Sequence, residues 1–153
     1  MTGDRRPQHQ RPPFRARRFA AGALGAFLIF AGTSHLSFAR KEFAQLVPDW
    51  MPLDKDDVVV QSGVVEIALG TGLLTLPASR ARLGMAIATL FIAVFPGNLD
   101  QFMHRKTAFG LDSDAGRLTR LAFQPLLVLW ALWSTGAWRE LRRSRSGHRG
   151  TSR

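Results

Sequence analysis

Six polar side chains in otherwise apolar surroundings are the residues of this sequence best placed to do chemistry. They are His35, Gln61, Glu66, Asn98, Arg120 and Gln124. Glu66 stands out because it is the single acid of residues 58–77, a stretch long enough for a membrane-spanning helix. A carboxylate at that depth costs about 2.5–3.5 kcal/mol on insertion scales, so a partner or a water-filled cavity must receive it. With a histidine and an arginine beside it, such an acid could orient a ligand and exchange protons with it.

Helical spacing predicts which side of its helix Glu66 occupies. Ser62 and Gly63 lie one turn before Glu66 and Gly70 lies one turn after it, so all four share a face. Small residues on that face let a second helix approach closely, which turns the acid toward packed protein and away from lipid. The simpler alternative is that Glu66 only forms a hydrogen bond to a neighbouring helix and holds the bundle together.

Four apolar runs predict the elements that position these side chains. They cover residues 19–38, 58–77, 83–99 and 121–138. Each has about the length of a helix that crosses the hydrocarbon layer. The mean hydropathy of -0.02 hides these runs, because most of the 21 Lys and Arg residues lie in the tails and connections. We therefore predict an all-α fold, an integral membrane four-helix bundle at residues 19–138, with disordered basic tails at 1–18 and 139–153.

The first run also admits a different interpretation. Arg17 and Arg18 precede it, and it ends in Ser37, Phe38 and Ala39, which resembles the cleavage site of a signal peptide. The run is longer than the apolar core of a typical signal peptide, and three more runs follow. A retained membrane helix is the better interpretation.

The basic residues predict the orientation of the bundle. Fourteen Lys and Arg residues lie in the two tails and in the connection 78–82, and seven lie in the connections on the other side. Cytoplasmic segments carry such an excess, so both termini should lie in the cytoplasm, with the chain in the cell membrane and its tails against anionic lipid headgroups. Because these basic residues flank apolar runs, the formal charge of +10 indicates membrane topology and no nucleic-acid partner.

This topology brings the six polar residues to a similar depth. His35 ends the first helix on the outer side, Asn98 ends the third helix there, and Arg120 opens the fourth. At a rise of 1.5 Å per residue, Glu66 lies roughly 12 Å below the start of the second helix, the deepest position of the six. We predict a ligand-binding cluster in the outer half of the bundle, with contributions from all four helices and without a metal.

The segment between the first two runs, residues 40–57, is predicted to cover this cluster. Phe43, Leu46, Val47 and Trp50 form an apolar stripe at helical spacing, which needs burial, although two prolines interrupt a continuous helix. The segment should therefore fold over the outer mouth of the bundle. The alternative is an ordinary polar loop with a small hydrophobic plug.

Short motifs along the chain also carry a family resemblance. They are AGTSH at 31–35, Val47-Pro48 followed by Pro52, SGVVE at 62–66, FPGN at 95–98, and Arg120 with Gln124. In this combination the chain resembles the DoxX-like family of small four-helix membrane proteins over residues 19–138. The resemblance implies an integral membrane protein and, for some relatives, the membrane subunit of a quinone-linked oxidoreductase. Most relatives have no assigned activity, so the resemblance supports the fold more than the function.

Three functional hypotheses follow. In the first, a quinone or similar lipid-soluble redox partner binds at the cluster, where His35, Glu66 and Arg120 form hydrogen bonds to a carbonyl oxygen and exchange protons. The chain has no cysteine and no evident pair of haem ligands, so the electrons would come from an oxidoreductase partner subunit. The second hypothesis is a non-catalytic scaffold or assembly factor whose polar layer sets the register of the helices. The third is an oligomeric small-molecule permease.

Overall fold

The described part of the chain is all-helical. The structure, a computed structural model, describes residues 14–110 and 113–147, and these residues form no β-strand. The elements are α1 (Phe14–Leu36), α2 (Arg40–Ala44), α3 (Lys55–Thr75), the short 3₁₀ helix η1 (Pro77–Ser79), α4 (Arg80–Ala93), α5 (Phe95–Met103), α6 (Asp114–Thr135) and α7 (Ala137–Gly147). The prediction of an all-α fold is confirmed.

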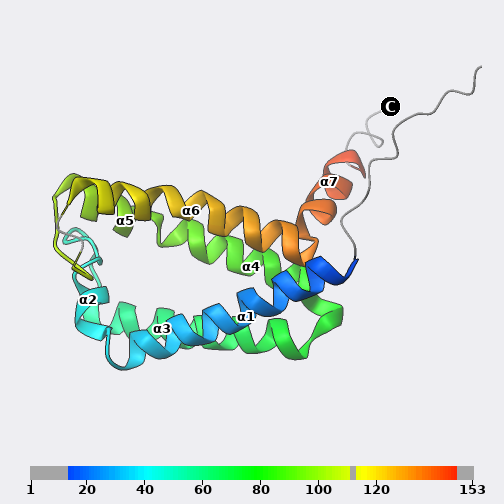
Figure 1. The fold of residues 1–153 in the computed structure, drawn as a ribbon, viewed down its shortest axis with the longest axis horizontal. Helices are drawn as coiled ribbons and strands as arrows, with labels where there is room; N and C mark the ends of the chain where they lie inside the picture. The colour runs from blue at the N-terminus through cyan, green and yellow to red at the C-terminus, as the bar shows by residue number, and fades with distance from the viewer. Residues whose placement is uncertain (1–13, 111–112, 148–153) are drawn as a thin grey trace, which may run out of the picture.

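The long helices form two layers (Figure 1). One layer contains α1 and α3, and the other contains α4, α5 and α6. At one end of the bundle, here the α2 end, α2 and the connection that follows α5 lie between the layers. At the opposite end, the α7 end, η1 joins α3 to α4, and α7 is bent from α6 by 80°. Gly136 makes that bend with a φ of 85°, a left-handed conformation that favours glycine.

Two glycine pairs set the contact between α1 and α3. A Cβ atom on Gly32 would lie 2.4 Å from the carbonyl oxygen of Gly63, and one on Gly70 would lie 2.6 Å from that of Gly25. Any larger residue would force these helices apart, so glycine permits direct contact of the two backbones. The expectation that the face of Gly63 and Gly70 admits a second helix is confirmed.

The core fills the half of the bundle nearer α7. Leu24 of α1, Leu73 of α3, Ile87 of α4 and Ala131 of α6 are buried there from both layers. Trp130 of α6 adds a polar contact between the layers, because its indole N–H donates to the backbone carbonyl of residue 20 on α1 at 3.1 Å. This packing ties the layers together at one end.

Three helical runs are long and apolar enough to cross a membrane. They are Arg15–Leu36, Lys55–Thr75 and Pro77–Met103, and the bent pair α6 and α7 makes a fourth if it is one span. The third run combines α4 and α5, which are separated at Val94 because the ring of Pro96 removes a backbone N–H from the helix.

Several predicted boundaries are corrected. Residues 14–18 belong to α1 and residues 139–147 belong to α7, although both were predicted to be disordered. The third run continues to Met103 instead of ending at residue 99. Arginine is a good helix former, so an arginine-rich segment readily extends a helix that its apolar part has nucleated. The rest of the predicted tails, residues 1–13 and 148–153, lies outside the described residues.

The substitution Gly32→Ala should destabilise the bundle by about 1–3 kcal/mol, because its methyl group overlaps the backbone of α3. Gly22→Ala, also in α1, is the matched control, since a Cβ atom there has no neighbour within 4 Å. This control should be neutral or more stable by up to about 1 kcal/mol, the helix preference of Ala over Gly. Thermal unfolding in detergent measures both, and equal stability of the two variants would contradict the glycine contact.

Candidate ligand-binding site

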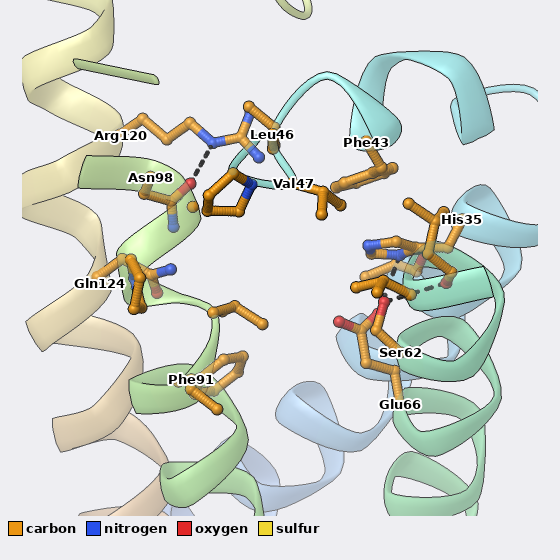
Figure 2. Close-up of a pocket in the computed structure, with 18 of the residues that line it drawn as sticks. His35, Phe43, Leu46, Val47, Ser62, Glu66, Phe91, Asn98, Arg120 and Gln124 are labelled. Atoms are coloured by element: carbon orange, nitrogen blue, oxygen red, sulfur yellow. Dashed lines mark hydrogen bonds and ion pairs between the residues drawn. The ribbon is translucent and has the colours of Figure 1, made fainter. Parts of the chain in front are cut away.

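A cavity of about 360 Å³ lies between the two layers at the α2 end. Its walls are mostly apolar and include Leu28 and Phe91 of the core. Five of the six predicted site residues line it, namely His35, Glu66, Asn98, Arg120 and Gln124. Figure 2 shows them in two groups that face each other across the cavity. An apolar chamber with a few convergent polar groups is typical of small-molecule sites.

His35 and Glu66 form the polar part of the first wall. The Nδ1 atom of His35 lies 2.8 Å from the carbonyl oxygen of Ala31 and 3.2 Å from Oε2 of Glu66. A carbonyl oxygen only accepts, so Nδ1 carries a hydrogen and donates it within α1. Oε2 of Glu66 is therefore in contact with the ring but has no hydrogen bond, although it is buried. A buried oxygen in this state is ready to bond to a ligand.

Asn98 of α5 and two residues of α6 form the opposite wall. The Nε atom of Arg120 donates to Oδ1 of Asn98 at 3.0 Å, which leaves most of the guanidinium donors for other partners. Gln124 lies one turn along α6 and is buried, with its Oε1 atom lacking a hydrogen bond among the described residues. This wall therefore offers several donors and one open acceptor.

Aromatic contacts connect the two walls. The ring of Phe43 in α2 stacks on His35 with centroids 3.5 Å apart, and meets the ring of Phe109 edge-on at 4.7 Å. The guanidinium of Arg120 lies 4.6 Å from the centroid of Phe109, which is a cation–π contact. The backbone N–H of Phe109 donates to Glu42 at 2.7 Å and holds this ring beside α2.

Residues 40–57, here the lid, lie over the cavity as predicted. Leu46, Val47 and Pro48 are buried and line it. The carbonyl oxygen of Leu46 would lie 2.7 Å from a Cβ atom on Gly97, so the backbone of the lid packs directly on α5.

Lys106 fastens the lid to the bundle. Its Nζ atom lies 3.0 Å from Asp49 of the lid and 2.8 Å from Asp100 of α5. Hydrogen bonds from Lys55 and Lys106 lower the pKa of Asp49 to about 2. Burial alone would lower the pKa of Lys106, but its hydrogen bonds to Asp100 and Asp49 outweigh burial and raise that pKa.

A comparison with protein families matches residues 24–135, which include both walls and the lid, to DUF8561, a domain of unknown function. The chain belongs to the DUF8561 family. No curated protein and no solved structure matches it. The DUF8561 match covers nearly all of the helices that surround the cavity and ends at the last residue of α6.

Gln61 is the predicted site residue that does not line the cavity of this DUF8561 domain. Its side chain is exposed, whereas the next residue, Ser62, lines the cavity. Neighbouring residues on a helix point about 100° apart, so the face of Glu66 includes Ser62, four residues before it, and excludes Gln61. The prediction for Gln61 is corrected on this ground.

Sequence reasoning missed Phe109 and the Asp100–Lys106 pair of the DUF8561 domain. Both belong to residues 100–120, which were read as one polar connection, although α5 extends to Met103 and α6 begins at Asp114. Phe102 and Phe109 are the two aromatic residues of this otherwise polar stretch, and that was the available signal for Phe109. No local pattern pointed to the ion pair, since its geometry depends on the fold.

Acid should release the lid. The folded-state pKa of Asp49 lies below its ordinary value of 3.8, so its pairing with the lysines stabilises the lid above that pH and is lost as the pH falls toward 2. Pepsin cleavage within residues 43–51, normalised to a free peptide of residues 40–57, should rise steeply between pH 4 and pH 2.

The variant Asp49→Asn should already be cleaved fast at pH 4, and its cleavage rate should depend less on pH than that of the wild-type protein. Asp57→Asn is the matched control, because Asp57 is an exposed acid at the same end but outside the Lys106 contacts. A flat wild-type profile would mean that Asp49 does not hold the lid.

Proposed function

We propose that this chain is an integral membrane protein with four spans that binds a quinone, or a similar flat lipid-soluble carbonyl compound, in the cavity beneath the lid. The outward faces of the helices support the membrane location. Large apolar residues such as Phe19, Phe30 and Ile92 are more than half exposed. Only 28% to 39% of each of the three apolar windows is buried, so a bilayer is the environment that would cover the remainder.

One observation carries the choice of ligand, namely the two polar groups on opposite walls of an apolar cavity. A quinone has a carbonyl oxygen at each end of a flat apolar ring, so it needs hydrogen-bonding groups at both ends and apolar surface between them. Arg120 and Gln124 supply donors at one wall, and a proton held by the His35–Glu66 pair would be donated to the other oxygen. The apolar side chains between the two polar walls therefore match the apolar ring between the two oxygens of a quinone.

The His35–Glu66 pair is suited to proton transfer. Reduction of a quinone to a quinol adds two electrons and two protons. The electrons would come from a flavin- or metal-bearing partner subunit, because the chain has no cysteine for a thiol or thiolate centre. One proton would pass from the acid–histidine pair to the nearer oxygen, and the other would come from water beside Arg120. The permanent charge of Arg120 would stabilise the negative charge that develops on the farther oxygen before it is protonated.

The DoxX-like resemblance supports the same function. The cavity-lining residues His35, Glu66, Asn98, Arg120 and Gln124 all belong to the motifs that carry that resemblance. We further propose that the α2 end faces outward and that the α7 end, with most of the basic residues, faces the cytoplasm from the cell membrane.

Glu66→Gln and Arg120→Gln should each raise the apparent Kd for a short-chain quinone about tenfold or more, because the first removes the acid that would give a proton to one carbonyl oxygen and the second removes a charged donor. The titration uses the fluorescence of purified protein, since Trp50 lines the cavity. Gln61→Ala is the matched control, as its exposed side chain lies outside the cavity. Unchanged affinity in folded Glu66→Gln protein would favour the scaffold, and no quinone binding by the wild-type protein would refute the proposal.

Reporter fusions after Arg145 and within residues 55–57 should report opposite sides of the membrane. These positions lie at opposite ends of the bundle (Figure 1). The same sidedness at both positions would exclude the four-span topology.

A further inference from the structure

A second cavity of about 340 Å³ lies at the α7 end, where the start of α1, the turn into α4 and the bend between α6 and α7 meet. It shares no lining residue with the first cavity. Five arginines line it, namely Arg17, Arg18, Arg80, Arg139 and Arg143. Glu140 is the single acid among its described lining residues. The cavity is therefore strongly positive, and its ligand should be an anion.

Two buried atoms in this cavity lack a hydrogen-bond partner within the described chain. They are the Oγ atom of Ser134 and the Nε atom of Arg80. Ser134 is only 5% exposed, so bulk water does not readily satisfy its hydroxyl group. Buried polar groups are normally hydrogen-bonded, and donors left open beside a cavity indicate where acceptor atoms of a ligand lie.

Arg17 is held at the rim of the cavity by the end of α6. Its Nε and Nη2 atoms donate to the carbonyl oxygen of Trp133 at 3.0 and 2.5 Å. This carbonyl belongs to the last turn of α6, whose acceptors have no partner within the helix. The contact fixes the guanidinium in place and leaves its remaining N–H groups for an anion.

The first turn of α4 adds positive charge. Arg80 and Ala81 at its start line the cavity, and the preceding Ser79 forms no side-chain cap. An uncapped helix N-terminus presents backbone N–H groups and a partial positive charge, which favour an anion.

We propose that this cavity binds a phosphate group, carried either by an anionic lipid headgroup or by a free phosphate compound. A phosphate has more acceptor oxygens than a carboxylate and suits the fork-shaped donors of arginine. It would use the open donors of Arg80 and Ser134 together. The proposal is independent of quinone binding, because the two cavities are separate.

Native mass spectrometry of the full chain in detergent tests the proposal with two lipids that differ only in the phosphate, phosphatidic acid and diacylglycerol. The wild-type protein should retain phosphatidic acid in preference to diacylglycerol. Inorganic phosphate forms the second arm. Displacement of the lipid by millimolar phosphate would indicate a site for a free phosphate compound, and no displacement would indicate a headgroup site.

Arg80→Gln should weaken retention about tenfold, the loss expected for one charge-assisted hydrogen bond, and Ser134→Ala should weaken it several-fold. If Arg80→Gln does not fold, Arg139→Gln replaces it as the test variant, because Arg139 is an exposed residue that also lines the cavity. Arg82→Gln is the matched control, since Arg82 is an exposed arginine two residues from Arg80 and outside the cavity. Equal weakening by Arg82→Gln would mean that general charge attraction explains the binding, and would contradict the proposed site. A wild-type protein that binds neither phosphatidic acid nor phosphate would also contradict it.

Discussion

The direct backbone contact between α1 and α3 is the constraint on which the cavity beneath the lid depends. Gly32 and Gly63 touch across the two helices, and His35 and Glu66 each lie three residues farther along. In the antiparallel pair these two residues lie on opposite sides of the glycine contact, with the Cβ atom of His35 beside Gly63 and that of Glu66 beside Gly32. Each side chain leans toward the N-terminus of its own helix, and therefore toward the other side chain. A larger residue at either glycine would push the helices apart and disturb the 3.2 Å contact between these side chains. The glycine contact also places Glu66 against α1, so its side chain is buried in protein.

The division of the bundle into a packed half and an open half follows from where the layers meet. Leu24, Leu73 and Ala131 fill the space between them near α7 and tie them together. Toward the α2 end the space is left for a cavity, and among the described residues the lid and the aromatic contacts through Phe109 bridge it. A region held by a few ion pairs and ring contacts opens at lower free energy than a packed core. The fold thus places its less tightly packed part around the candidate site.

The two ends of the molecule also differ in charge chemistry. The cavity beneath the lid contains a paired acid and an arginine in apolar walls, whereas the cavity at the α7 end is lined by arginines and polar groups. The first arrangement suits a neutral ligand that exchanges protons, and the second suits an anion. Membership of the DUF8561 family assigns neither role, because a shared fold does not define the chemistry of the sites built on it.

The sequence by itself determined the helical class, the four apolar runs and the face of Glu66, because these depend on spacing within single helices. The same spacing places Ser62 beside Glu66, but the prediction also included Gln61 because of its depth in the helix, and the structure corrects that position. Only the tertiary structure decided that Phe109 joins the walls and that Lys106 fastens the lid. These contacts join segments far apart in the chain, and their formation depends on how the layers pack and not on any local pattern.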